Sequence, residues 1–367
     1  MNILRNVKYR TIYLSLGVLL FLLIILSTRV GAVNISYNQI LDFFLDAAGK
    51  KPYGEINPII EGLFFQIRLP RTFMCFIVGA ALSVSGALMQ SLFRNPIVEP
   101  GLVGTSAGAA LGASLMFVFG KTSLFASVFF LGDLLLPVSA FIGGLVATII
   151  VYKFSSYYGK VNVATMILAG IAVNAMAAGG TGFLSYFARD PQARSITFWN
   201  LGTFSGADWK SVIIVSISTA LCFVLVLRYS KQLNAIQLGE TEAGYLGFNV
   251  ERMKIQLILI NTLMVAVATS MVGVISFVGL IVPHLLRLLH GSDNRYLIRN
   301  GALLGALLLS LSDVVARILL RPAELPIGIV TSIIGVPIFT FLMQSISLPE
   351  EIWCIIPRAC ITELWSE

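Results

Sequence analysis

Long apolar runs, separated by short polar turns, alternate along most of this chain. A transmembrane helix needs about 20 consecutive, mostly apolar residues, and ten runs approach or reach that length. They lie at about residues 11–30, 69–93, 101–119, 126–152, 162–187, 209–228, 255–273, 276–290, 297–319 and 326–344. We therefore predict an all-α integral membrane protein with ten transmembrane helices, contained in a single domain at 1–345.

Three segments interrupt or follow this pattern. Residues 32–60 are polar and rich in turns, and they predict an extramembrane loop with a short amphipathic helix at about 36–46. Residues 228–254 form the most polar internal segment. Residues 346–367 are half polar and carry two tryptophans, so we expect a C-terminal extension that lies at the membrane interface.

The last apolar runs contain features that a simple membrane anchor does not need. Asp313 and Arg317 lie four residues apart inside one run, although an ionised side chain in mid-membrane costs roughly 3 kcal/mol. Prolines and glycines also interrupt residues 273–341, and such breaks persist only where protein or water satisfies the backbone. This combination indicates a packed helical bundle around a polar path.

Composition supports a membrane protein and excludes several other classes. Hydrophobic residues make up 57% of the chain and charged residues only 12%, against about 25% charged in soluble domains. The net charge of +7 comes from basic residues placed singly at run ends, so we predict no nucleic-acid partner. The four cysteines and two histidines have no metal-ligand spacing, and we expect no metal site.

The basic amino terminus and a weak excess of Lys and Arg place both termini in the cytoplasm. Gly86 precedes Arg94 by eight residues, and Gly279 precedes Arg287 by the same spacing. Five predicted spans separate the two pairs, and we interpret them as a weak inverted repeat, as transporters often contain.

Six short motifs occur in order along nearly the whole chain and resemble one known family. The resemblance is to the FecCD-type permease subunit of ABC importers for iron-siderophore, haem or cobalamin, a type II importer permease. The motifs are Arg68-Leu-Pro-Arg71, Arg94-Asn-Pro96, Glu99-Pro-Gly101, Gly279-Leu-Ile-Val-Pro-His284-Leu-Leu-Arg287, Asp313-Val-Val-Ala-Arg317 and Glu324-Leu-Pro-Ile-Gly328.

The resemblance implies a homodimer in the bacterial inner membrane, with the translocation path along the dimer interface. Two cytoplasmic ATPase subunits would carry ATP-Mg and bind a short helical pair at 238–250. The matching positions are Leu238, Gly239, Glu240, Ala243, Leu246 and Gly247. A plain solvated loop is the alternative interpretation of this segment. Gly120-Lys121-Thr122 lacks the earlier glycine of a phosphate loop, because residue 115 is Leu115, so no nucleotide site or other cofactor site is expected in this chain.

The resemblance also implies that a periplasmic substrate-binding protein docks through acidic residues onto Arg68, Arg71 and Arg317. Arginine suits this contact because its planar fork pairs bidentately with carboxylates. The alternative is that Arg317 pairs with Asp313 one helical turn away, while the other two arginines only reach toward the membrane surface.

Small and polar residues in three apolar runs are candidates for the translocation path. These candidates are Gly104, Ser106, Asn174, Thr331 and Ser332. Close helix packing by small residues is the alternative explanation, and membrane lipid would surround the remaining helix faces.

The function that this sequence predicts is a permease subunit that moves an iron(III)-siderophore complex, haem or cobalamin into the cytoplasm. We expect no enzymatic activity, because no nucleophile–base set is present. The alternative is a secondary transporter driven by an ion gradient. That alternative calls for paired carboxylates near the membrane midplane, and Asp313 is the only acidic residue well inside an apolar run. The motifs do not distinguish between the three cargoes.

Overall fold

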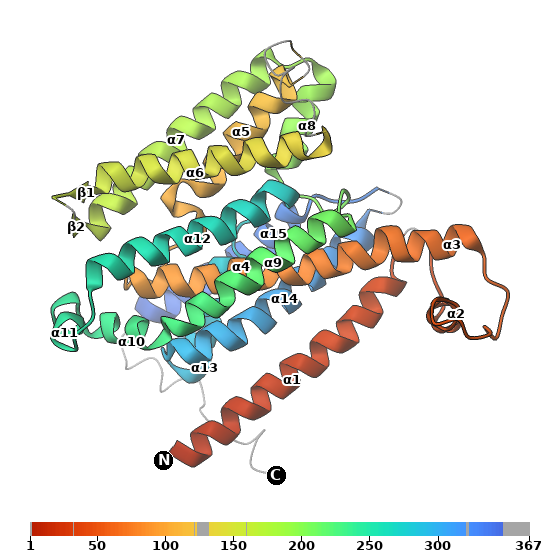
Figure 1. Ribbon diagram of the computed structural model, residues 1–367, viewed down its shortest axis with the longest axis horizontal. Coiled ribbons are helices and arrows are strands. Elements are labelled where there is room, and N and C mark those ends of the chain that lie inside the picture. Colours follow the sequence, from red (N-terminus) through yellow and green to blue (C-terminus); the bar gives the residue numbers. More distant parts are fainter. Residues whose placement is uncertain are drawn as a thin grey trace.

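The fold is a bundle of helices, seen in a computed structural model (Figure 1). The structure describes residues 2–31, 33–120, 122, 132–158, 160–320 and 323–347. Most of the C-terminal extension at 346–367 lies outside these residues, as does the first part of the span predicted at 126–152. Within the described chain the prediction of an all-α membrane protein is confirmed.

Seven helices of the described chain are long and apolar enough to cross a membrane. They are α1 (Asn2–Arg29), a continuous helix made of α3 (Pro58–Leu63), a π-helical turn η1 (Phe64–Arg68) and α4 (Leu69–Leu92), and then α6 (Leu135–Ser155), α7 (Val163–Phe187), α9 (Trp209–Arg228), α12 (Val250–Val272) and α14 (Asn294–Leu319). Three apolar helices are shorter, namely α5 (Thr105–Phe119), α13 (Val278–His290) and α15 (Ile327–Ser347). Each of the ten predicted spans corresponds to one of these helices, while ten membrane crossings stay a prediction.

The other elements are short and lie at the ends of the bundle or between its helices. The amphipathic helix predicted at 36–46 is present as α2 (Tyr37–Ala47). The remaining elements are a 3-10 turn η2 (Pro100–Val103), α8 (Asp190–Asn200), α10 (Ser230–Leu238), α11 (Glu240–Tyr245) and a two-residue antiparallel ladder of β1 (Ser156–Tyr157) with β2 (Lys160–Val161).

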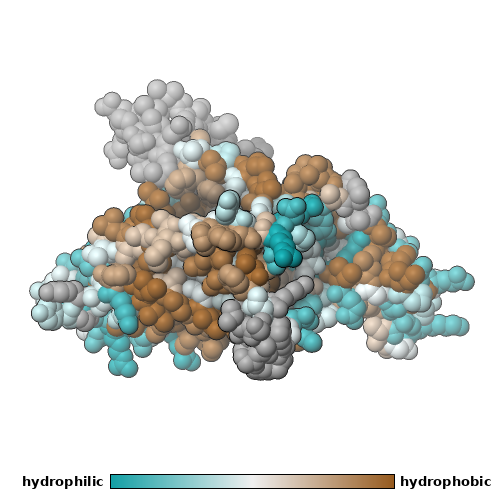
Figure 2. All heavy atoms as spheres, turned by 90° about the horizontal axis from the view of Figure 1, so that it is seen from above, coloured by the Kyte–Doolittle hydropathy of each residue, from teal (hydrophilic) through white to brown (hydrophobic). Residues whose placement is uncertain are grey.

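The helices form two layers that run along the same axis (Figure 1). One layer holds α4, α9, α12 and α14, and the other holds α5, α6, α7 and α8. We call the end of the bundle with α10, α11 and the β1–β2 hairpin the coupling end, and the end with α2, α3 and α8 the far end. On the face drawn in Figure 2, hydrophobic residues cover much of the middle and hydrophilic residues gather toward both ends, as a membrane-spanning bundle requires.

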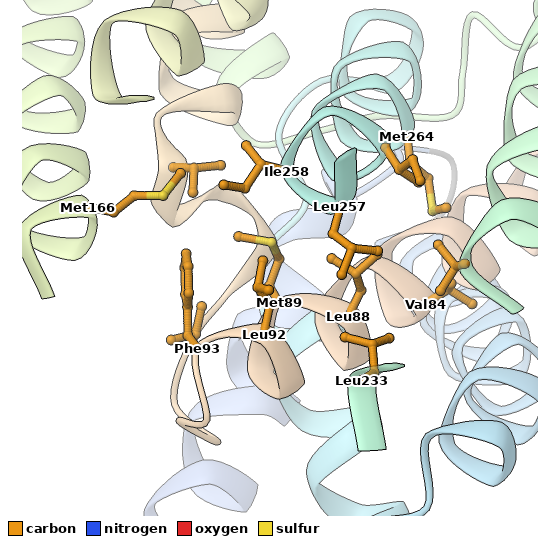
Figure 3. Packing of buried hydrophobic residues seen from close by; sticks show 14 of the residues in the cluster. Val84, Leu88, Met89, Leu92, Phe93, Met166, Leu233, Leu257, Ile258 and Met264 are labelled. Atoms are coloured by element: carbon orange, nitrogen blue, oxygen red, sulfur yellow. The ribbon is translucent and has the colours of Figure 1, made fainter. Parts of the chain in front are cut away.

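The core of the bundle is centred on α4. Its apolar window is 83% buried, whereas the windows of α1, α6, α7 and α9 are only 17–28% buried. Figure 3 shows why: Leu88 and Met89 of α4 lie at the centre of one apolar cluster that also contains Leu257 of α12, Leu233 of α10 and Met166 of α7. The peripheral helices therefore turn most of their apolar surface outward, where lipid or a partner chain can cover it.

Glycines let α4 approach two other helices at backbone contact. A Cβ added at Gly86 would lie 1.8 Å from the carbonyl oxygen of Gly279 in α13, and one at Gly79 would lie 2.4 Å from that of Gly305 in α14. Small residues at helix crossings permit this spacing in membranes. The backbones of α13 and α14 therefore lie in direct contact with α4 at these two glycines.

The motif pairs Gly86/Arg94 and Gly279/Arg287 do not mark an inverted repeat. Gly86 contacts Gly279, and Gln90 and Ser91, one turn further along α4, accept hydrogen bonds from Arg287, two turns further along α13. The two segments therefore run in the same direction. The sequence interpretation was wrong on this point, because an odd number of intervening spans restores the original direction.

Candidate functional site

A cavity of about 620 Å³ lies among α5, α7 and α8 of one layer and the segment that follows α12. Its volume falls within the roughly 300–1,000 Å³ typical of ligand sites. The walls come from η2, the start of α5, the second half of α7, α8 and the extended residues 274–276. The polar side chains among its lining residues are Glu99, Ser106, Asn174, Thr181, Ser185, Thr197, Asn200 and Ser276.

Two residues of α7 that line this cavity each have a buried polar atom without a partner. Asn174 donates to the carbonyl oxygen of Leu102 at 3.5 Å, but its own amide oxygen has no hydrogen-bond partner among the described residues. The hydroxyl of Thr181 has none there either. Buried polar groups are costly to leave unsatisfied, so these atoms favour a cavity that holds water or a polar part of a ligand.

Glu99 closes the cavity on the side of the core. It precedes η2, and one carboxylate oxygen accepts a hydrogen bond at 3.2 Å from the backbone N–H of Phe277, directly before α13. Phe277 has a left-handed backbone with φ of 70°, which is rare for an aromatic residue. Glu99 therefore joins the turn before α5 to the turn before α13, two helix starts from distant parts of the sequence.

The structure brings two of the five path candidates to the cavity. Ser106 and Asn174 line it, whereas Gly104, Thr331 and Ser332 are not among its lining residues. Gly104 has a φ of 91° and packs against Ala147 and Val151 of α6. Thr331 is buried and donates to Gly328 of its own helix, and Ser332 is half-buried. A path role for the five residues stays a prediction.

Most of the polar residues that line the cavity were not predicted from the sequence. Asn174, Ala178, Thr181 and Ser185 recur at intervals of three or four along α7, which places small and polar residues on one helix face. The spacing of these residues could therefore have predicted a polar helix face. Glu99 gave no such signal, because its contact with Phe277 joins residues 178 positions apart.

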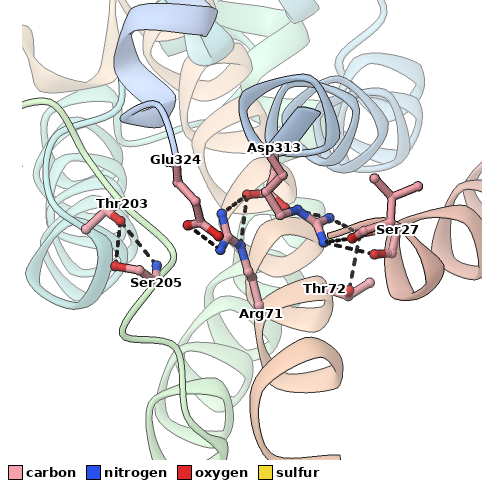
Figure 4. Close-up of polar contacts among 9 residues, drawn as sticks. Ser27, Arg71, Thr72, Thr203, Ser205, Asp313 and Glu324 are labelled. Atoms are coloured by element: carbon pink, nitrogen blue, oxygen red, sulfur yellow. Dashed lines mark hydrogen bonds and ion pairs between the residues drawn. The ribbon is translucent and has the colours of Figure 1, made fainter. Parts of the chain in front are cut away.

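The predicted docking arginines lie in a buried ionic cluster at the far end. We define the far-end cluster as Arg71, Asp313, Arg317 and Glu324. Figure 4 shows Arg71 between two carboxylates: its Nη2 lies 2.8 Å from Asp313 Oδ1, and its Nη1 lies 2.7 Å from Glu324 Oε2. Arg317 pairs with the other oxygen of Asp313 at 2.9 Å. The cluster therefore contains two cations and two anions.

Arg317 and Arg68 hold the end of α1. Arg317 donates to the carbonyl oxygens of Ser27 and Val30, at 3.0 and 2.7 Å. Arg68 donates to the carbonyl oxygens of Thr28, Arg29 and Val33. The last carbonyls of a helix lack partners within the helix, and cations are favoured there by the helix dipole. These two arginines therefore cap α1, which otherwise has little buried surface.

The pairing of Arg317 with Asp313, which the sequence offered as the alternative to docking, is present. All three predicted docking residues are buried, since Arg68, Arg71 and Arg317 are only 5–8% exposed. Burial of these arginines does not test docking in a complex, so docking stays a prediction. It does restrict how docking can occur, because a partner's carboxylate has to replace an internal one.

The predicted coupling segment at 238–250 contains one short helix, α11, and the other helix of the pair, α10, lies before it and ends at Leu238. Gly239 turns the chain with φ of 143°, α11 begins at Glu240, and Gly247 turns it again with φ of 85°. Ala243 is fully buried and anchors α11. The exposed apolar side chains of this segment are Leu238, Tyr245 and Leu246, which are 60–87% exposed. Apolar side chains left exposed together indicate a contact surface.

A second ionic cluster lies beside this segment. We define the coupling-end cluster as Lys254, Glu240 and Glu251. Lys254 of α12 is only 2% exposed, and its ammonium group lies 2.6 Å from Glu240 Oε2 and 3.1 Å from Glu251 Oε1. It also donates to the carbonyl oxygen of Val161 in β2 at 3.1 Å. The sequence analysis did not single out Lys254, since a basic residue near the end of an apolar run is common.

The described residues contain no group of three or more His, Cys, Asp and Glu side chains that could hold a metal ion. His284 is the histidine whose side chain is described, and its Nε2 has no hydrogen-bond partner within the described chain.

Comparisons with known proteins agree with this arrangement over nearly the whole chain. The model of the FecCD transport family matches residues 19–345. The hemin transport system permease protein HmuU of Yersinia pestis is 39% identical over 90% of this chain and 95% of its own. The vitamin B12 import system permease protein BtuC of Salmonella typhi is 36% identical over 92% of this chain and 95% of its own.

A solved structure shares both the fold and the sequence pattern. It is an ABC transporter in an inward-facing conformation, which its description assigns to the metal-chelate type. The TM-score is 0.78 and the identity 30%, over 92% of this chain and 99% of the other. The likeness therefore covers the overall arrangement of the helices as well as the sequence.

Proposed function

This chain belongs to the FecCD transport family, and we propose that it is the membrane-spanning permease subunit of an ATP-driven importer for haem, cobalamin or an iron(III)-siderophore complex. The cavity among η2, α5, α7 and α8 carries this proposal. It has the volume of a ligand site, its polar groups come from five separate elements, and no metal-ligand group accompanies it among the described residues. A bulky organic chelate fits such a cavity better than a bare ion does.

The proposal includes the partners that the family resemblance implies. Two copies of this chain would pair in the bacterial inner membrane, with the coupling end in the cytoplasm. Cytoplasmic ATPase subunits with bound ATP-Mg would dock on the exposed Leu238, Tyr245 and Leu246, because burial of these side chains gives a favourable contact. Their nucleotide-driven movement would then alternate the cavity's access between the two sides.

A substrate-binding protein would dock at the far end, near Arg68, Arg71 and Arg317. Since these arginines have internal partners, an acidic partner surface can bind only by exchange. Glu324 is the carboxylate suited to exchange, because its side chain is 43% exposed whereas that of Asp313 is 1% exposed. Docking would therefore release Glu324 from Arg71 and leave Asp313 in place.

A secondary transporter driven by an ion gradient finds less support. Asp313, the acidic residue inside a span, is paired with both Arg71 and Arg317. A carboxylate that already pairs with two buried arginines is poorly suited to binding and releasing a proton or cation in each cycle, because each exchange would leave the arginines without their partner.

Reconstitution tests the proposed function and identifies the cargo. The chain, its neighbouring ATPase and its binding protein would be placed in proteoliposomes, and uptake of iron-siderophore, haem and cobalamin measured with and without ATP. We expect ATP-dependent uptake of one of these cargoes. Uptake driven by a proton or sodium gradient in the absence of the ATPase would overturn the proposal.

Variants in the cavity connect this uptake to the site. Thr181→Val and Asn174→Leu remove polar atoms of residues that line the cavity, and we expect each to lower the uptake rate severalfold without loss of folded protein. Thr340→Val is the matched control, because Thr340 is exposed on α15 and donates only to carbonyls of its own helix. Equal uptake by the cavity variants and this control would exclude the cavity from the path.

A further inference from the structure

We propose that Lys254 is a positioning residue that transmits movement of the coupling segment to α7 and the cavity. This inference rests on the proposed function, because it concerns how ATP hydrolysis is linked to transport. Its basis is that the coupling-end cluster joins three elements that have few other contacts with one another: α11, α12 and the β1–β2 hairpin.

Lys254 is the centre of this junction. Its ammonium group contacts Glu240 at the first position of α11, Glu251 one turn earlier on α12, and the backbone carbonyl of Val161 in β2. Glu251 also accepts a hydrogen bond from the backbone N–H of Val161 at 2.8 Å. Residue 161 is therefore held at both its N–H and its carbonyl, which fixes the hairpin to α12 and, through Lys254, to α11.

The burial of Lys254 ties this junction to one arrangement of its ion pairs. A Lys side chain is rarely fully buried unless it is paired, and Lys254 is 2% exposed. A buried ion pair often contributes little net stability, because removing the charges from water is costly. The two carboxylates are 38% and 31% exposed and stay in contact with solvent. The arrangement thus fixes the position of α11 more than it adds to the stability of the bundle.

The hairpin leads directly into the helix that lines the cavity. α7 begins at Val163, two residues after Val161. Asn174 lies eleven residues further along α7, or about 16 Å at 1.5 Å per residue, and Thr181 lies two turns beyond it. A helix moves as a rigid element, so a shift of Val161 displaces the two cavity-lining residues whose polar atoms lack partners.

The hollow beside the cluster leaves space for such a shift. A second cavity of about 510 Å³ is lined by residues of the hairpin and the start of α7, together with Glu240, Glu251 and Lys254. The junction is therefore not packed on all sides. α11 can change its angle to α12 while Lys254 keeps its bonds, and the hairpin follows.

The test measures transport and ATP hydrolysis together in the reconstituted complex with its ATPase and binding protein. Lys254→Met removes the junction, and Glu240→Gln removes only its link to α11. We expect the amount of cargo transported per ATP hydrolysed to fall at least about fivefold in both variants, which corresponds to the lower end of typical coupling free energies. We expect ATP hydrolysis itself to continue. Lys153→Met is the matched control, because Lys153 is exposed in the last turn of α6.

The outcomes separate this inference from the proposed function. If the unaltered complex imports no cargo with ATP, the proposed function fails. If it does, and both variants transport as much cargo per ATP as the control, the inference about Lys254 is wrong. If Lys254→Met does not fold, Glu240→Gln decides, because Gln keeps the shape of a half-exposed side chain. A purely structural role would lower transport and hydrolysis in proportion and leave their ratio unchanged.

Discussion

The two ionic clusters lie at opposite ends of the same bundle and are built differently. The far-end cluster has balanced charges, and three of its four side chains are at most 9% exposed. The coupling-end cluster surrounds one buried cation with two half-exposed carboxylates. The far-end cluster joins α4 and α14 and, through Arg317, holds α1, and these helices already pack together, whereas the coupling-end cluster joins elements that have few other contacts with one another.

This difference gives the two clusters different mechanical roles: one fixes helices in place, and the other can pass a movement from one element to the next. The buried part of the far-end cluster, Asp313 with its two arginines, has one arrangement, because any shift leaves a buried charge unpaired. A cluster with solvent-accessible carboxylates tolerates small changes of angle, since water replaces a contact that is lost. The far end therefore holds the core rigid, and the coupling end provides a joint between a moving segment and that core.

The largest expected effect is on the far-end cluster. Asp313→Asn leaves Arg71 and Arg317 without their shared carboxylate, and breaking a buried pair typically costs about 3–5 kcal/mol of stability. We expect a large fall in the thermal unfolding midpoint of the purified chain in detergent, followed by tryptophan fluorescence.

Two variants sharpen that result. Asp46→Asn, at an exposed position in α2, should change stability by less than about 0.5 kcal/mol. Lys254→Met should lie between the two, because the glutamates that it leaves unpaired can be hydrated. If Lys254→Met lowers the midpoint as much as Asp313→Asn does, the two clusters do not differ in the way that the comparison requires.

The next effect concerns the core between the clusters. Gly86→Ala puts a methyl group into the backbone of α13, where the only relief is a shift of the helices, and overpacking of this kind costs about 1–3 kcal/mol. Unfolding midpoints again measure the effect. Gly62→Ala is the control, since a Cβ at Gly62 meets nothing within 4 Å. An unchanged midpoint for Gly86→Ala would mean that α4 and α13 can slide past one another.

The smallest effect is expected at Glu324, the exposed member of the far-end cluster. Glu324→Gln should cost at most about 1 kcal/mol, as for other pairs in contact with solvent, and the loss should shrink at high salt. The same variant should tighten binding of the substrate-binding protein, because Arg71 no longer has to exchange a carboxylate. Biolayer interferometry at two salt concentrations measures this, with the exposed Glu55→Gln as control. Weaker binding would contradict the exchange.

The helices were predictable from the sequence because each depends on local composition. An apolar run of sufficient length bounded by polar residues predicts its own helix, and the predicted ranges for α7 and α9 lie within a residue of the observed bounds. The helical pair at the coupling segment and the amphipathic α2 were predictable for the same reason, since glycine and serine mark their ends.

The ionic clusters were predictable only in part: the spacing of Asp313 and Arg317 indicated their pairing, whereas the fold alone brings Arg71 to them. Arg71 and Asp313 lie 242 positions apart, and the resemblance to known permeases favoured an exposed position for Arg71. Glu99 was quoted only as part of a motif. The relative direction of the Gly86 and Gly279 motifs was predictable, because five intervening spans give two helices the same direction.

The short helix α13 also has a consequence for biogenesis. Its thirteen residues rise only about 20 Å, and a bilayer core is about 30 Å thick, so in the predicted ten-span arrangement the non-helical residues 273–277 would complete the crossing. Their backbone groups find partners in Trp199, whose carbonyl accepts from Val274, and in Glu99, which accepts from Phe277. Both partners precede α13 in the chain, so the ribosome has already delivered them when this segment emerges. The order of synthesis thus allows a stretch that could not enter the membrane alone to insert against a surface that is already present.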